Sequence, residues 1–220
     1  SSFDYANDVV LDFEGRIVVV GSANGRAGIA RFMPDGQLDT GFDEDGVTDL
    51  GSSPAAAVLP VSVLLQRDGR IVFAGTNGHV ALVRLDDDGA IDPGFGLAGV
   101  ATIPFDLTVP ANESANDLVL QSDGKLVMVG NARYGDSNEL SAIAARLSPS
   151  GSADPTFGEG GKAIFTFGLS AIDSQLFTSA GLAAGRILAA GAAIVGDNEL
   201  SYDGMVVRLD NDLLFADGFH

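Results

Sequence analysis

A strand–turn–strand pattern recurs four times along the 220-residue chain, and this repeat constrains the fold more than any other feature. In the second copy, Leu65-Gln66-Arg67 leads into Asp68-Gly69, and Ile71-Val72-Phe73 follows. Gly accepts the positive φ that a tight hairpin needs, Asp tolerates it, and β-branched and aromatic residues favour strands. The turn glycines are separated by 54, 55 and 61 residues: Gly15, Gly69, Gly124 and Gly185.

Each copy continues with further strand and turn signals. An apolar run ends in an arginine followed by an apolar residue (Arg31, Arg84, Arg146 and Arg208). A second turn then leads to a phenylalanine, which we call the anchor (Phe42, Phe95, Phe157 and Phe219). In the first three copies another short strand is expected after the anchor, over residues 46–50, 99–103 and 161–165.

Four short strands in a repeat of this length, with no amphipathic helix between them, are typical of a β-propeller blade. We therefore expect an all-β fold, a β-propeller of about four blades with mostly four antiparallel strands each. The chain is expected to form a single domain over residues 1–220, with repeats at about 1–51, 52–106, 107–168 and 169–220. The alternative is an arc of a larger propeller. Strands with nearly continuous apolar residues, such as 17–20 and 80–85, are expected to be covered on both faces.

Composition and charge narrow the possible partners. Apolar residues make up 46% of the chain, which indicates a folded core. Twelve Lys and Arg against 30 Asp and Glu give a net charge of −18, which disfavours nucleic acid and anionic membrane surfaces and leaves cationic partners or calcium open. No apolar run is long enough to insert in a membrane, and no leader-like segment opens the sequence. Without Cys, there is neither a disulfide nor a thiol nucleophile.

The repeat resembles a known family. Asp-Gly-Arg/Lys-Ile-Val-Val-x-Gly, then apolar-Ala-Arg, then Asp-Gly-x-Leu-Asp-x-x-Phe-Gly is similar to the bacterial delta-60 repeat. The fourth copy departs from it, since Leu213 stands in place of the turn Gly and Ala216 in place of the following Asp. The resemblance implies a β-propeller from a large, often exported or surface-associated bacterial protein. It brings no agreed activity and no catalytic residues.

Arginine and aspartate recur at a fixed spacing of eight residues, as Arg31 with Asp39, Arg84 with Asp92 and Arg146 with Asp154. A hairpin of that length returns the Asp beside the Arg, whose planar guanidinium suits a carboxylate. We interpret the pairs as one structural ion pair per blade. The functional alternative is a ring of arginines that binds an anion in a central channel. Arg208 must use Asp217 or another partner, so its pair is expected to be the weakest.

The aromatic residues favour packing over ligand stacking. The four anchors are most simply core residues between blades, because aromatic side chains bury large areas. A stacking platform for sugars is the alternative, although the chain has no Trp and its three tyrosines are Tyr5, Tyr134 and Tyr202.

The sequence contains few candidate residues for metal binding or catalysis. Asp43-Glu44-Asp45-Gly46 and Asp86-Asp87-Asp88-Gly89 are acidic turns that suit calcium in part, but they lack the full set of ligands. We therefore expect solvated turns and no cofactor, with calcium as the alternative. The histidines are His79 and His220, and no nucleophile elbow surrounds any Ser. Paired carboxylates of the glycosidase kind stay open, since 30 acids allow many pairs.

Polar insertions in the second half of the chain are the best candidates for a binding surface. They span residues 109–114, 133–140 and 196–203 and are expected to be loops on one rim. The leading hypothesis is a non-catalytic binding or scaffold module of an exported, cell-surface or periplasmic bacterial protein. Its partner would be a protein, a glycan or the rest of a larger polypeptide. The alternatives are a hydrolase or lyase with carboxylates in the channel, and a purely architectural spacer. No catalytic, ligand-binding or metal residue is assigned.

Overall fold

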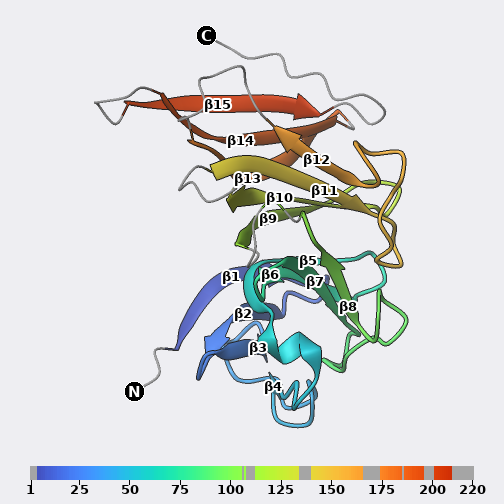
Figure 1. Ribbon diagram of the computed structural model, residues 1–220. Helices are drawn as coiled ribbons and strands as arrows, with labels where there is room; N and C mark the ends of the chain where they lie inside the picture. The colour runs from blue at the N-terminus through green and yellow to red at the C-terminus, as the bar shows by residue number, and fades with distance from the viewer. Residues whose placement is uncertain are drawn as a thin grey trace. The chain divides into compact units, whose positions relative to one another are not determined.

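The computed structural model describes residues 4–105, 107, 112–133, 140–165, 174–184, 186–195 and 201–209. Over these residues the chain forms four antiparallel sheets, one for each sequence copy (Figure 1). In every sheet the strands follow one another in chain order, as expected when each is joined to the next by a hairpin or short connection. The prediction of an all-β fold with propeller-type sheets is confirmed. Closure of the sheets into a ring stays a prediction.

The first two sheets have four strands each. Sheet 1 contains β1 (Tyr5–Leu11), β2 (Ile17–Ala23), β3 (Arg26–Phe32) and β4 (Val47–Thr48). A short 3₁₀ helix, η1 (Pro54–Ala57), leads into sheet 2. Sheet 2 contains β5 (Leu59–Leu65), β6 (Ile71–Thr76), β7 (Val80–Leu85) and β8 (Val100–Ile103).

The other two sheets differ in strand number. Sheet 3 contains β9 (Glu113–Leu120), β10 (Leu126–Arg133), β11 (Leu140–Leu147) and β12 (Lys162–Phe165). In the part of copy four that the structure describes, sheet 4 contains three strands, β13 (Ser174–Ala183), β14 (Arg186–Val195) and β15 (Ser201–Leu209). The strands expected after the first three anchors are thus present as β4, β8 and β12. Within the described residues, no helix has the length and apolar character to cross a membrane.

The chain divides into two compact units, each of which holds two sheets. Unit 1 covers residues 1–102 and unit 2 covers residues 103–220. In unit 1, one face of sheet 1 packs against one face of sheet 2, and Val18, Val20, Ile71 and Phe73 meet in the core. In unit 2, Val127, Val129, Ile187 and Ala189 form the equivalent core between sheets 3 and 4.

Two names describe these faces throughout. The trailing face of a sheet bears the positions of Val18 and Val20, and the leading face bears those of Ile17 and Val19. In each unit the trailing face of the first sheet therefore covers the leading face of the second.

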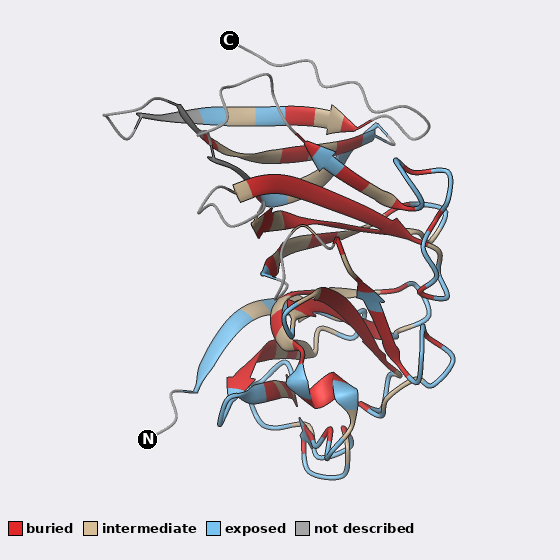
Figure 2. Ribbon diagram, viewed as in Figure 1, coloured by how far each residue is buried: buried red, intermediate tan, exposed pale blue. Residues whose placement is uncertain are grey.

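Burial of the central strands only partly follows the prediction. Strands β6, β7, β10 and β11 are almost fully buried on both faces (Figure 2). The prediction is wrong for copy one, because β2 and β3 alternate between buried and half-exposed residues. Apolar composition predicts which residues can be buried, but a neighbouring sheet has to be present to bury them.

A β-bulge interrupts the first strand of every sheet and explains the last glycine of the motif. The register shifts at Ala6/Asp8 in β1, and equivalent shifts occur in β5, β9 and β13. The bulged backbone approaches the neighbouring strand closely. A Cβ on Gly75 would lie 2.1 Å from the Leu59 carbonyl oxygen, and one on Gly21 would lie 2.0 Å from that of Tyr5. Glycine is required there because no side chain fits.

Candidate functional site

The predicted arginine–aspartate pairs form in the first three copies. Arg31 Nε lies 2.6 Å from Asp39 Oδ2, and the same atoms of Arg84 and Asp92 lie 2.8 Å apart. Arg146 and Asp154, also at 2.8 Å, are the most deeply buried pair. The backbone assists, since the N–H of each Asp donates to the carbonyl of its own Arg. The structural interpretation is therefore confirmed for these copies, while Asp217 lies outside the described residues.

The arginines also stack on the anchors, which sequence reasoning missed. The guanidinium carbons of Arg31, Arg84 and Arg146 lie 4.5, 4.7 and 4.9 Å from the ring centroids of Phe42, Phe95 and Phe157. A cation over an aromatic face is attracted by the ring's quadrupole. These three anchors are buried, which confirms their predicted core role. The constant spacing of eleven residues from each Arg to its Phe was the available signal. Phe219 lies outside the described residues.

The paired carboxyls have lowered pKa values. Burial by itself would raise the pKa of Asp154, but hydrogen bonds from Thr156 and Lys125 and the charge of Arg146 hold it well below its usual range. Asp39 and Asp92 are partly desolvated too, yet hydrogen bonds from backbone N–H groups and their Arg partners lower the pKa of each. A carboxyl that acts as a general acid needs a raised pKa. With their lowered pKa values, these three carboxyls are suited to stay ionised.

A second repeated contact joins neighbouring sheets at their first-strand bulges. Asn7 Nδ2 donates to the Pro60 carbonyl at 2.6 Å, and Val63 N–H donates to Asp8 Oδ2 at 2.8 Å. In unit 2, Asn116 donates to the Phe177 carbonyl and Ala180 N–H donates to Asp117 Oδ2 at 2.7 Å. We call this arrangement the Asn-Asp clamp.

The clamp occurs in alternate copies. Copies one and three carry Asn-Asp at the bulge, whereas copies two and four carry Val61-Ser62 and Thr178-Ser179. Each Asp also accepts the N–H of the residue that follows it, Val9 or Leu118. The carboxylate of each clamp Asp therefore accepts one backbone N–H from its own bulge and one from the bulge of the following sheet. The Asn-Asp match between residues 7–8 and 116–117 is visible in the sequence, but its role depends on contacts between sheets.

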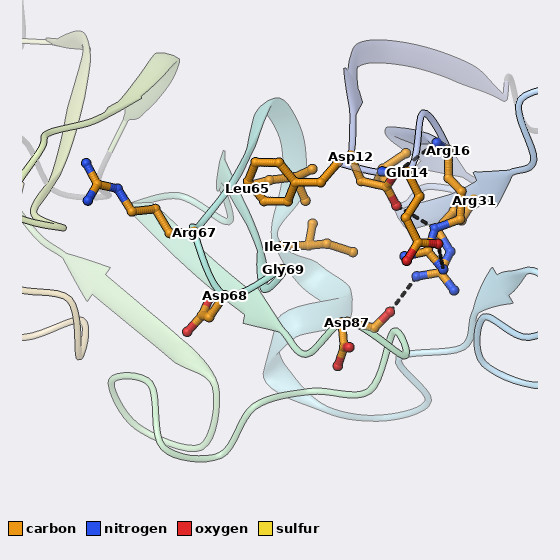
Figure 3. Close-up of a pocket in the computed structure, with 12 residues that line it drawn as sticks. Asp12, Glu14, Arg16, Arg31, Leu65, Arg67, Asp68, Gly69, Ile71 and Asp87 are labelled. Atoms are coloured by element: carbon orange, nitrogen blue, oxygen red, sulfur yellow. Dashed lines mark hydrogen bonds and ion pairs between the residues drawn. The ribbon is translucent and has the colours of Figure 1, made fainter.

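A small polar recess lies between the turns of sheets 1 and 2. It has a volume of about 290 Å³ and is lined by Asp12, Glu14, Arg16, Arg31 and Asp87, together with parts of β2, β5, β6 and their turns (Figure 3). Arg16 pairs with Asp12, and Arg31 is held by Asp39 and the Asp87 carbonyl. Arg67, at the rim, points away from this cluster (Figure 3).

The recess can accept a small polar molecule, but two of its arginines are already paired, Arg16 with Asp12 and Arg31 with Asp39. Burial would raise the pKa of Asp12, yet hydrogen bonds from the Arg16 side chain and from the N–H groups of Arg16 and Glu14 lower it. Neither a hydroxyl nucleophile nor an imidazole is among the lining residues. The lowered pKa keeps Asp12 ionised beside Arg16, so this pair is suited to a structural role.

The acidic turns use their carboxylates to hold backbone. Asp43 Oδ2 accepts the N–H of Asp49 at 2.8 Å, Asp45 accepts that of Val47, and Asp86 accepts those of Asp88 and Ala90. In the part of the chain that the structure describes, no group of three or more His, Cys, Asp or Glu side chains could hold a metal ion. Calcium binding stays an open alternative for the whole chain.

The remaining candidate residues are scattered. His79 lies in the β6–β7 hairpin, at the opposite end of sheet 2 from the recess, and its carbonyl accepts hydrogen bonds from Asn77 and Thr76. Tyr5 is half-exposed at the start of β1. His220 and Tyr134 lie outside the described residues.

The described strand ends that flank the predicted loops lie at one end of the sheets of unit 2. The β10–β11 hairpin closes at the pair Arg133↔Leu140, next to the pair Ala132↔Glu113 where β9 begins. The β14–β15 hairpin closes at Val195↔Ser201, at the end where β13 begins. Because the clamp aligns β9 with β13, the paired strand ends Arg133↔Leu140 and Val195↔Ser201 lie at the same end of unit 2. Most of residues 109–114, 133–140 and 196–203 lies outside the described residues.

Four antiparallel sheets in chain order, which clamps at the first-strand bulges couple in pairs within each unit, define a protein of the β-propeller type. Three segments of the chain, residues 15–42, 66–95 and 121–157, match the family model "Domain of unknown function (DUF5122) beta-propeller". In copies one to three, each matched segment runs from the turn between the first and second strands of the sheet to the anchor phenylalanine. No curated protein matched the chain.

Solved structures resemble the chain in fold at low identity. The K499G mutant of NanB sialidase from Streptococcus pneumoniae is 13% identical with a TM-score of 0.54, over 89% of this chain and 28% of that one. Alpha-L-arabinanase from Cellvibrio cellulosa is 15% identical with a TM-score of 0.51, over 96% and 76%. Drosophila Semaphorin 1a, extracellular domains 1-2, is 10% identical with a TM-score of 0.50, over 94% and 41%. This chain thus spans less than half of the sialidase and semaphorin chains, and the likeness shows the fold alone.

Proposed function

We propose that this chain is a non-catalytic binding or scaffold module of an exported or surface-associated bacterial protein, built from delta-60-type repeats. Its partner is a protein or glycan that contacts the end of unit 2 where the long hairpins emerge. Propeller folds support both enzymes and binding proteins, so the argument has to come from the site.

The observation that carries the proposal is the change in hairpin length on a constant scaffold. Between paired strand ends, the second-to-third-strand loops contain residues 24–25 in sheet 1 and 77–79 in sheet 2. The corresponding loops contain residues 134–139 in sheet 3 and 196–200 in sheet 4. Longer loops at one end of rigid sheets are where binding residues concentrate.

Carboxylates in the first strands, and Asp4 just before β1, accept backbone hydrogen bonds, which supports a non-catalytic role. Asp4 accepts the N–H of Asn24, Asp8 accepts those of Val9 and Val63, and Asp117 accepts those of Leu118 and Ala180. Glu113, which is buried, accepts the N–H of Phe105. A hydrolase or lyase needs carboxylates that are available to substrate, whereas these hold backbone.

Replacement of residues 134–139 by Asn-Gly, the pair that closes the β2–β3 hairpin, tests the proposal. Wild-type and shortened proteins are compared on a glycan array and on immobilised bacterial envelope proteins, with Arg67→Ala in the β5–β6 turn of unit 1 as the control. Binding by wild type and Arg67→Ala that is lost in the shortened protein, with an unchanged melting temperature, is expected. Turnover of arabino- or sialo-oligosaccharides by the wild type, or equal binding by the shortened protein, contradicts the proposal.

A further inference from the structure

The leading face of sheet 1 is apolar and uncovered. Val9 on β1 is 56% exposed, whereas the equivalent Val63 and Leu118 are 6% and 5% exposed. Val19 pairs with Val9 on the same face and is half-buried, while the equivalent Phe73 and Met128 are fully buried. Figure 2 shows β1 mostly in the colour of exposed residues. This face has the composition of a core face without its neighbour.

The uncovered leading face of sheet 1 contains an apolar groove. The groove has a volume of about 330 Å³ and an almost entirely apolar lining, which includes Tyr5, Val19 and Val47. Ala30 lies opposite both Val19 and Val47 in the strand register, so these side chains share the face. A contiguous apolar surface of this kind marks an interaction site.

On sheet 4 it is the trailing face that is uncovered. Val206 on the trailing face is 48% exposed, whereas the equivalent Ile29 is 1% exposed and Ala144 is fully buried. Leu188 and Ala190, which pair with Arg208 and Val206, are half-buried. One chain therefore carries an uncovered leading face and an uncovered trailing face. In both units these two kinds of face already pack on each other.

The bulge contacts indicate which type of sheet fits on sheet 1. The N–H of Val63 in copy two depends on the Asp of the preceding sheet, but the N–H of Val9 is bound by its own Asp8. A sheet that covers sheet 1 therefore has no need of an Asn-Asp clamp. Sheet 4 has this property, because its bulge carries Thr178-Ser179.

From these observations we propose that the leading face of sheet 1 binds the trailing face of sheet 4 of a second copy of this chain. The contact repeats the sheet packing found inside each unit. It is heterologous, so further copies can add to form a closed ring or an open filament. Each chain carries a charge of −18, so the repulsion between copies weakens in salt and association strengthens.

Sedimentation velocity and light scattering over a wide range of protein concentration, at low and high salt, test the proposal. The wild type is expected to reach at least twice the 22.5 kDa of one chain, more readily at high salt. Val9→Asp and Val47→Asp on the leading face, and Val206→Asp on the trailing face, are each expected to stay near 22.5 kDa. Leu97→Asp, which alters a residue that is 85% exposed and lies on neither face, should associate as the wild type does.

Mixing the variants gives the decisive result. Val9→Asp retains an intact trailing face and Val206→Asp retains an intact leading face, so their mixture should form a one-to-one pair that does not grow further. Circular dichroism melting confirms that each variant is folded. A wild type that stays at the mass of one chain, self-association of Val206→Asp alone, or a mixture that does not associate overturns the proposal.

Discussion

Asp8 in the first strand of sheet 1 accepts a hydrogen bond from the backbone N–H of Val63 in the first strand of sheet 2, at 2.8 Å. The same contact recurs in unit 2 between Asp117 and Ala180, at 2.7 Å. Each carboxylate thus links two sheets at their bulges. The copies that supply the Asp alternate with the copies that receive it, so the sheets are coupled in pairs, which matches the two compact units.

Arg84→Ala should destabilise the protein by about 3 kcal/mol, because it leaves a largely buried Asp92 without its main cation and removes the contact with Phe95. Arg70→Ala is the matched control. Arg70 lies 3.4 Å from the same Asp92 but is 44% exposed, so its loss should cost less than about 1 kcal/mol. Urea denaturation measures both, and equal unfolding free energies for Arg84→Ala and wild type would refute the structural role of the pair.

Gly75→Ala should cost about 3 kcal/mol, the upper end of overpacking penalties, because the new Cβ would lie 2.1 Å from the Leu59 carbonyl oxygen. Gly204→Ala in β15 meets no atom within 4 Å and should leave stability nearly unchanged. Thermal melting compares the two. Similar melting temperatures for both variants would show that the bulge does not approach Gly75 as described.

Ala98→Gly should stabilise the protein by about 0.5–1 kcal/mol, since Ala98 is exposed and adopts a φ of +53°. Copy three carries Gly160 at the equivalent position with a φ of +61° and open space around it. The reverse change, Gly160→Ala, should therefore destabilise by a similar amount. Chemical denaturation of both variants checks the pair, and shifts of the same sign would contradict the backbone argument.

Acid should destabilise the fold through the paired aspartates. The folded pKa values of Asp39, Asp92 and Asp154 lie below the ordinary value of 3.8, so the unfolded chain binds protons that the folded chain does not. Their contribution is complete above about pH 5 and is lost as the pH falls through the folded pKa values. Asp154→Asn should be less stable at neutral pH and should lose less stability in acid. Melting curves from neutral to acid pH test this, and identical slopes for the variant and wild type would contradict it.

Much of the fold was predictable because the repeat carries its own local signals. The Asp-Gly turns, the β-branched runs and the fixed Arg–Asp spacing predicted four sheets, the ion pairs and the buried anchors. Burial of Val19 and Val9 was not predictable in the same way. The sequence of copy one resembles that of copy two, and the difference lies in whether another sheet covers it.

The candidate site was less predictable for a related reason. The Asn-Asp clamp and the stacking of Arg on Phe join residues whose contacts depend on the packing of whole sheets and turns. Loop length was readable from the sequence, and the strand register then placed the ends of both long hairpins at one end of unit 2.

The central claim is that the two copies within each unit are separate sheets joined side by side at their first-strand bulges. Amide hydrogen exchange of Val63 and Ala180, in wild type and in Asp8→Ser, tests it most directly, because Ser is the natural residue of copies two and four at this position. Both amides should be protected in the wild type. In Asp8→Ser, exchange at Val63 should accelerate about tenfold, as expected for one lost hydrogen bond, while Ala180 stays protected. An unprotected Val63 in the wild type, or equal acceleration at both amides, would contradict the claim.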